Sequence, residues 1–400
     1  MKKTNAVTAL AAAAVLGTAG AAWAVPEVSA VTMTQRANSR IVDIGYTLSG
    51  EESIVTLSIE TNGVPIPDSA VTRLSGDIST VVQAGAGKSI VWNAGADWPE
   101  HSVTDAKAKV TAWVTNAPPQ VMVIDLSKGT SATEEDPYPV FYYNSLDALP
   151  GGGLSNDVYK TDMLVMNKIP SGFYAMGDES TSGASVTVTL TQAFYAGVYE
   201  VTQKQWYKVK GTDPSDFKNT AGPVNKVSYD DIRGTLAQGG GDWPADDSVY
   251  ASSFIGLLRT KAGIAGFDLP TDAQWEYACR AGTTTYHNDG ISGSASSQLD
   301  DLGWWSGNSG ASTHTVGQKT PNAWGLYDMH GNVWEWSLDW YAFALSGGPD
   351  PLGADSGSDR VRRGGSWSSS ASYCRSAGRR DRAPSSRNSS IGFRLVRTLP

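Results

Sequence analysis

The residues most able to do chemistry in this chain lie in its last forty positions, 361–400, together with one cysteine upstream. Two apolar anchors, residues 364–367 (GGSW) and 391–394 (IGFR), enclose 23 residues that include no Val, Ile, Leu, Phe, Met or Trp and no Lys, Glu or Gln. This interval cannot bury itself as a helix or strand of its own, because it has no apolar face. A segment held at both ends and free to vary between them is typical of a ligand-contacting surface on a rigid scaffold.

Arginine is concentrated in the same region. Between Asp359 and Arg397 there are ten Arg, two Asp and no Lys or Glu. Such an excess could form an anion-binding face. Arginine also ties irregular backbone together through its several donors, and we favour this structural role.

The N-terminus has the pattern of an export signal. Lys2 and Lys3 precede a run rich in Ala, Val and Leu, and residues 22–24 (AWA) fit the cleavage pattern of small residues. We therefore expect residues 1–24 to be a signal peptide and the protein to be exported. No other stretch approaches 18 continuous apolar residues, so we expect no membrane span.

The chain has only two cysteines, Cys279 and Cys374. In an oxidising compartment an isolated pair is most simply a disulfide. It would close a loop of 95 residues, which the chain-entropy model values at about 4–5 kcal/mol.

Charge and histidine content argue against two functions, nucleic-acid binding and a metal site built from histidines. The net charge of −9 and the isoelectric point near 5.0 make nucleic acid a poor partner. None of the four histidines is three or four residues from another, so their spacing indicates no metal site; they are His101, His287, His314 and His330. We expect His330 to be a surface or turn residue.

Two regions must position these residues. Residues 25–117 alternate apolar and polar side chains, as in 41–48, 55–59 and 109–114, and turn signals separate the alternating stretches. This pattern predicts an immunoglobulin-like or fibronectin-like β-sandwich. We expect residues 118–164, which begin with Pro118 and Pro119, to be a stiff linker and an extended segment that wraps the second domain.

Residues 165–400 predict a domain of mixed helix and strand with much irregular structure, so the whole chain is of the α+β class. Ser228 with Asp231, and Thr271 with Gln274, have the spacing of helix caps. The second pair opens a helix over 272–280. A third helix is expected over 248–261.

Several segments of this domain resemble the formylglycine-generating enzyme (sulfatase-modifying factor) family, which has a modified C-type-lectin-like fold. They are residues 173–178 (FYAMGD), 194–202 (FYAGVYEVT), 223–230 (PVNKVSYD), 269–282 (LPTDAQWEYACRAG), 325–336 (GLYDMHGNVWEW), 363–367 (RGGSW) and 392–394 (GFR). Their order and spacing cover roughly residues 165–397, so the first domain lies outside the resemblance.

The resemblance implies a copper site that this chain cannot complete. Oxidases of the family bind copper through two cysteines after the GGS motif, and the matching residues here are Ser369 and Cys374. A soft metal requires two thiolates there, and Ser369 supplies none. The family also pairs the cysteine that matches Cys279 with one in this tail. Ser366 and Trp334 match active-site positions. Copper is therefore unlikely on chemical grounds, and with it the catalytic alternative that would use Cys374, Ser366 and Trp334.

The resemblance also implies calcium at the segment 328–335 (DMHGNVWE). The matching ligands are Asp328, Gly331, Val333 and Glu335. Hard oxygen ligands around a tight turn suit calcium. The alternative is that Glu335 only accepts backbone hydrogen bonds in an irregular loop.

The tail also resembles the C-terminal variable region of ligand-binding proteins diversified by retroelements. Their frame corresponds here to 364–367, Ala371, Cys374, Arg375, Ala377, Arg379, Pro384, Arg387 and 391–396. An undiversified polar loop on the same frame is the alternative. The residues between the frame positions are the candidate ligand contacts: Ser368, Ser370, Ser372, Tyr373, Gly378, Arg380, Asp381, Arg382, Ser385, Ser386, Asn388 and Ser389.

Two functions from different classes follow. The first is an exported, non-catalytic protein whose tail binds a protein or glycan ligand, since Tyr and Ser suit adaptable binding surfaces. The second is a copper- and oxygen-dependent oxidase acting on a peptidyl cysteine or a small thiol. The missing second cysteine favours the first.

Overall fold

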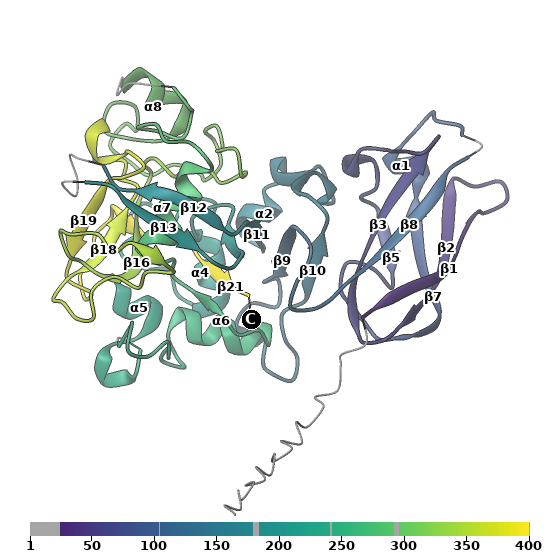
Figure 1. The fold of residues 1–400 in the computed structure, drawn as a ribbon, viewed down its shortest axis with the longest axis horizontal. Coiled ribbons are helices and arrows are strands. Elements are labelled where there is room, and N and C mark those ends of the chain that lie inside the picture. The colour runs from purple at the N-terminus through teal and green to yellow at the C-terminus, as the bar shows by residue number, and fades with distance from the viewer. Residues whose placement is uncertain (1–24, 104, 179–183, 241, 292–295, 400) are drawn as a thin grey trace, which may run out of the picture.

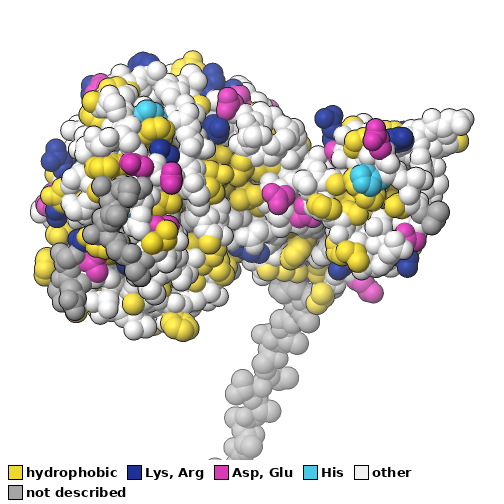
Figure 2. Space-filling view, turned by 90° about the horizontal axis from the view of Figure 1, so that it is seen from above, with side chains coloured by type: hydrophobic (Ala, Val, Ile, Leu, Met, Phe, Trp, Pro, Cys, Tyr) yellow, Lys and Arg dark blue, Asp and Glu magenta, His cyan; other side chains and the backbone are white. Residues whose placement is uncertain are grey.

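The computed structural model describes residues 25–103, 105–178, 184–240, 242–291 and 296–399. The predicted signal peptide, residues 1–24, lies outside these ranges. The chain forms two lobes, which Figures 1 and 2 show from two directions. The smaller lobe is N-terminal.

The N-terminal lobe consists of two antiparallel sheets. One has the order β1 (Glu27–Gln35), β2 (Ile41–Ser49), β7 (Gly85–Asn93), β5 (Leu74–Gly76). In the other, β3 (Ser53–Thr61) pairs with β4 (Val64–Pro65), β6 (Val81–Val82) and β8 (Lys107–Trp113). The two sheets share one core, in which Val42 and Ile44 of β2 join Val55 and Leu57 of β3. A short helix, α1 (Ala94–Asp97), follows β7.

A six-stranded antiparallel sheet forms the base of the second lobe. Its order is β10 (Val140–Tyr143), β9 (Val121–Asp125), β11 (Met163–Ile169), β14 (Phe194–Gly197), β21 (Val396–Thr398), β15 (Phe267–Asp268). Residues 121–125, 140–143 and 163–164 of the segment expected to be a linker are thus strands of this sheet. The reason is burial: Val121, Met122, Val123 and Ile124 are all covered, so β9 has apolar neighbours on both faces.

Hydrogen bonds join this sheet to the N-terminal lobe. The backbone N–H of Tyr142 donates to the Ser79 carbonyl at 2.6 Å. The Ser145 hydroxyl lies 2.6 Å from a carboxylate oxygen of Asp68. The two lobes therefore meet at β10 and the residues after it.

Two smaller sheets complete the second lobe. One has the order β12 (Gly172–Met176), β13 (Val186–Leu190), β17 (Gly348–Pro349). The other has the order β19 (Arg379–Arg382), β18 (Arg360–Arg363), β16 (Trp334–Trp340), β20 (Ile391–Gly392), and three of these strands, β18, β19 and β20, come from the tail or its start. Along the longest axis of the molecule, Figure 1 places β18 and β19 at the end opposite the N-terminal lobe.

Local capping signals account for most of the helices. α5 (Tyr229–Arg233) begins after Ser228, and α7 (Asp272–Arg280) begins after Thr271, each with the predicted capping box. The third predicted helix is shorter than 248–261. As α6 (Phe254–Ala262), it begins at Ser253, whose hydroxyl accepts from the N–H of Gly256. The other helices are α2 (Val158–Thr161), α4 (Gln203–Lys210) and α8 (Ser296–Leu302).

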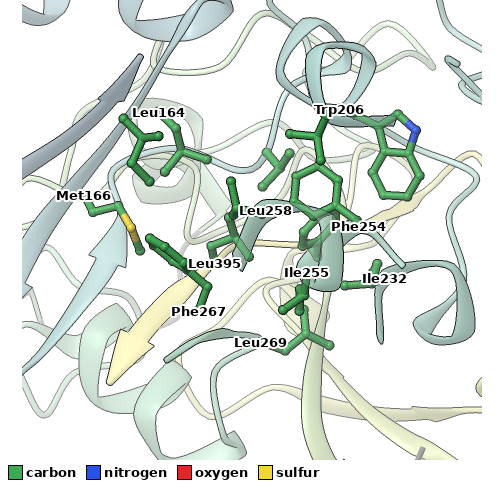
Figure 3. Packing of buried hydrophobic residues seen from close by; sticks show 14 of the residues in the cluster. Leu164, Met166, Trp206, Ile232, Phe254, Ile255, Leu258, Phe267, Leu269 and Leu395 are labelled. Carbon is green, nitrogen blue, oxygen red and sulfur yellow. The ribbon is translucent and has the colours of Figure 1, made fainter. Parts of the chain in front are cut away.

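The main core lies between the six-stranded sheet and helices α4, α5 and α6 (Figure 3). Met166 from the sheet and Leu258 from α6 are both fully buried in it. Trp206 of α4 stacks on Phe254 with ring centroids 5.0 Å apart. These helices border the tail, so the core holds in place the surface against which the tail packs. No helix in the described ranges has both the length and the apolar character needed to cross a membrane.

Candidate functional site

The tail leaves the sheet at a turn that only glycine can form. Gly365 has φ +78°, and a Cβ placed on it would lie 2.4 Å from the sulfur of Cys374. The left-handed backbone and the close approach both exclude larger residues. The start of the tail is therefore packed directly against Cys374.

Arg363, at the end of β18, holds the tail from inside. Its guanidinium is fully buried between Asp272 and Glu276 of α7, with 3.0 Å to the Glu276 carboxylate. The same group donates to the carbonyls of Ser376 at 3.2 Å and Gly378 at 3.3 Å. Arg363 thus joins α7 to the backbone of the tail.

Arg379 repeats this arrangement from the tail itself. It lies 2.6 Å from Asp272 and donates to the Ala342 carbonyl at 2.9 Å. Burial by itself would raise the pKa of Asp272, but Arg363 and Arg379 outweigh it, and the pKa lies below its ordinary value. Asp272 is therefore a carboxylate shared by two arginines.

The remaining frame arginines are also bonded. Arg375 donates to the Tyr286 hydroxyl at 2.8 Å. Arg387 makes a two-pronged contact with Asp231 at 2.6 and 2.7 Å. Arg394 bonds Glu335 at 2.8 Å and the Tyr327 carbonyl at 2.7 Å. These contacts agree with a structural role for most of the arginines. Arg380 and Arg382 differ, since both are exposed on the edge strand β19.

The residues at the expected copper position do not fit that metal. The hydroxyls of Ser366 and Ser369 lie 3.0 Å apart, and the Ser369 oxygen also accepts from the N–H of Ser366. Cys374 is completely buried, and this burial raises the pKa of its thiol to about 12. Trp334 is buried beneath Arg362, whose guanidinium lies 4.8 Å from the ring. The donor set is one protonated thiol and two hydroxyls, whereas copper(I) prefers a pair of thiolates.

The expected disulfide is not formed. Cys279 and Cys374 are both free, buried cysteines. The His330 ring contacts both residues: its Nε2 lies 3.8 Å from the Cys279 sulfur, and its Nδ1 lies 2.6 Å from the Cys374 backbone carbonyl. His330 was expected to be a surface or turn residue; it does lie in a turn, but its ring is fully buried, and this burial lowers its pKa to about 3.

The predicted calcium ligands fit a cation only in part. Asp328 accepts from the N–H of Gly317 at 2.7 Å with one oxygen, and its other oxygen has no partner among the described residues. Glu335, however, is already bonded to Arg394 and to the Trp275 indole at 2.7 Å. Gly331 and Val333 would offer only backbone carbonyls. Across the described ranges, no group of three or more His, Cys, Asp or Glu side chains is placed to hold a metal.

A buried carboxylate beside this loop was not found from the sequence. Glu200 is fully buried and accepts from the Asn332 amide at 2.7 Å and from the N–H of Val333 at 3.0 Å. Burial first, and then Asp328 and Glu335, raise its pKa well above the ordinary value. Glu200 therefore holds the loop through hydrogen bonds to Asn332 and Val333.

Burial separates the candidate contacts from the frame. Ser386 and Ser389 are half-buried. Gly378 is buried, and its carbonyl accepts a hydrogen bond from Arg363. A Cβ on this residue would lie 2.7 Å from the Tyr373 carbonyl, so Gly378 belongs with the frame. The other nine candidates are exposed: Ser368, Ser370, Ser372, Tyr373, Arg380, Asp381, Arg382, Ser385 and Asn388. Apart from Arg387, the frame positions are buried or half-buried.

Seven of the exposed candidates lie in two short stretches. Residues 368–373 include a single turn of 3-10 helix, Ala371–Tyr373, and residues 380–382 lie on β19. The Arg380 guanidinium stands 4.3 Å from the Tyr373 ring, so the two stretches are in contact. We call these seven residues the tail surface. The arrangement provides an aromatic ring, charges of both signs and several hydroxyls, but no nucleophile activated by a base.

Thiol titration tests the state of the two cysteines. We predict that the native protein, purified without reductant, reacts at neither thiol, because both are buried and protonated. In denaturant, two thiols should react. Finding none there would mean that a disulfide forms after all.

Arg363 should be essential for stability. Arg363→Ala removes one of the two arginines that pair with each of the buried carboxylates Asp272 and Glu276, and it leaves the carbonyls of Ser376 and Gly378 without this donor. We expect it to lower the free energy of unfolding by about 3–5 kcal/mol. The control, Arg382→Ala on the exposed edge strand, should change it by about 0.5 kcal/mol or less. Urea denaturation measures both. Equal effects of the two substitutions would contradict the structural role of Arg363.

Comparison with known proteins identifies the family of the second lobe. The model of the sulfatase-modifying factor enzyme 1-like domain matches residues 155–399. A Paenibacillus barcinonensis protein named chaperone protein LppX is 30% identical over 54% of this chain and 82% of its own length. The formylglycine-generating enzyme of Mus musculus is 37% identical over 61% of this chain and 78% of its own length. Among solved structures, Treponema denticola variable protein 1 is 30% identical, with a TM-score of 0.49, over 60% of this chain and 96% of that one. The chain belongs to the family of sulfatase-modifying factor enzyme 1-like (formylglycine-generating enzyme-like) proteins.

Proposed function

We propose that this protein is exported and that it binds a protein or glycan ligand through its tail surface, without catalysis. The observation that carries the proposal is the separation within the tail between buried frame residues and exposed polar positions. Side chains on the exposed positions can change without disturbing the core. Their place at the end of the molecule away from the N-terminal lobe leaves them accessible (Figure 1).

The chemistry of the tail surface suits binding. Tyr373 offers a rigid ring, 40% exposed, that Arg380 covers on one side. Ser368, Ser370 and Ser372 add small groups that donate and accept hydrogen bonds. An immunoglobulin-like or fibronectin-like N-terminal lobe would serve as a spacer that presents this surface.

Oxidation of a peptidyl cysteine or small thiol is less well supported. The family's oxidases need two cysteines at a position where this chain has Ser369 and a buried Cys374. The relatives include a protein named a chaperone as well as enzymes, so membership of the family does not by itself imply oxidase activity.

The binding proposal is tested on an array of glycans and extracellular proteins. The wild-type protein should bind a defined subset of the array. The double variant Tyr373→Ala, Arg380→Ala should bind that subset at least tenfold more weakly, because it loses the ring and the charge stacked on it. Tyr207→Ala is the matched control: this tyrosine is 48% exposed on α4, outside the tail.

Two results would overturn the proposal. One is equal binding by the double variant and the wild-type protein. The other is oxidation of a cysteine-containing peptide by the wild-type protein loaded with copper(I).

We also propose calcium binding at the Asp328 loop, with Asp328 as the side-chain ligand. Its unpartnered buried oxygen supports this proposal, and Glu335 is excluded by its pairing with Arg394. Because one carboxylate makes a weak site, millimolar calcium should raise the melting temperature, and Asp328→Asn should abolish the rise. An unchanged melting temperature of the wild-type protein would exclude the site.

A further inference from the structure

A cleft at residues 385–387 of the tail has the features of a binding site that the sequence did not indicate. It has a volume of about 440 Å³ and lies where Ser385 and Arg387 of the tail meet α4, α5 and the residues before α6. This volume is in the range of small-molecule sites, about 300–1,000 Å³. Tail residues and residues outside the tail therefore line one hollow.

The charges that line the cleft balance. Its lining includes two carboxylates, Asp230 and Asp231, and two cations, Lys210 and Arg387. Arg387 is bonded to Asp231, and the Lys210 ammonium donates to the Ser252 carbonyl at 2.6 Å. Both cations are therefore already engaged, and the lining as a whole is neutral.

Asp230 is the acceptor left for a ligand. Within the described part of the chain its carboxylate makes no ion pair, and burial first and Asp231 second raise its pKa. A half-buried carboxylate of this kind is stabilised by hydroxyl donors, which form strong hydrogen bonds to a charged oxygen. Thr235 and Ser385 add hydroxyls to the same lining.

Two aromatic residues border the cleft. Tyr250 is 36% exposed and gives a ring on which an apolar face can stack. Trp206 is 3% exposed, and no described residue accepts from its indole N–H. Figure 3 shows this nitrogen on the side of the ring that faces away from the labelled aliphatic residues. The nitrogen itself is buried, so Trp206 forms part of the cleft wall and is not open to a ligand oxygen.

We propose that the cleft binds one sugar residue of a neutral glycan. Sugar hydroxyls would donate to Asp230 and exchange hydrogen bonds with Thr235 and Ser385, and the C–H face of the sugar would lie on Tyr250. This inference rests on the proposed function and narrows its ligand from protein or glycan to a neutral glycan.

The lining argues against other ligands. A nucleic acid or an acidic peptide would require an excess of cations, whereas both cations here are paired. An apolar peptide anchor would require a hydrophobic pocket, whereas this one is lined mostly by Ser, Thr, Asp and Lys.

The test uses the full-length protein on an array of neutral and acidic oligosaccharides and basic peptides. We expect binding to neutral oligosaccharides. Asp230→Asn and Tyr250→Ala should each weaken it at least tenfold. The matched controls, Asp242→Asn and Tyr207→Ala, lie outside the cleft and should bind as the wild-type protein does. Thermal melting confirms that each variant is folded.

The outcomes separate this inference from the proposed function. Binding that falls in Tyr373→Ala, Arg380→Ala but not in the cleft variants would overturn the cleft and leave the tail surface standing. Binding only to basic peptides, or to no oligosaccharide, would also overturn the cleft. Binding lost in the cleft variants but kept in the tail-surface variant would support the cleft and contradict the tail surface.

Discussion

The buried guanidinium of Arg363 is the interaction on which the rest of the tail depends. Asp272 and Glu276 neutralise it from α7, and its remaining donors hold two carbonyls of a segment that has no apolar face of its own. A loop of this composition cannot be held in place by burial of apolar side chains. Buried ion pairs and the hydrogen bonds of their guanidinium groups hold it instead. Arg379, in the middle of the tail, and Arg394, near its end, are held by buried carboxylates in the same way.

This arrangement explains why the tail can be both irregular and ordered. The donors of the frame arginines satisfy carbonyls that a sheet would otherwise satisfy, and Gly365 lets the backbone pass against Cys374. The exposed residues between the frame positions then contribute little to holding the fold together. They are free to be selected for contact with something outside the molecule, which is the physical basis of the proposed binding role.

Features set by neighbours in sequence could be predicted. The capping boxes at Ser228 and Thr271, the alternation of β2 and the division of the tail into anchors and polar positions all depend on residues close together in the chain.

Features set by contacts between distant parts of the chain could not be predicted. Residues 118–164 could not be assigned to the sheet, because β9 gains its place by pairing with β11. Composition suggested a disulfide, but only the fold brings the His330 ring into contact with both cysteines. Glu335 was expected to bind calcium, and its partner is Arg394, 59 residues away.

Saturation mutagenesis of residues 361–397, with the fraction of folded protein as the readout, tests the central claim most directly. The account predicts broad tolerance at the exposed positions, such as Ser370, Tyr373 and Asp381. It predicts intolerance at Arg363, Gly365, Arg379 and Arg394. Similar tolerance at both sets, or intolerance throughout the tail, would contradict the claim that a buried arginine frame carries a surface free to vary.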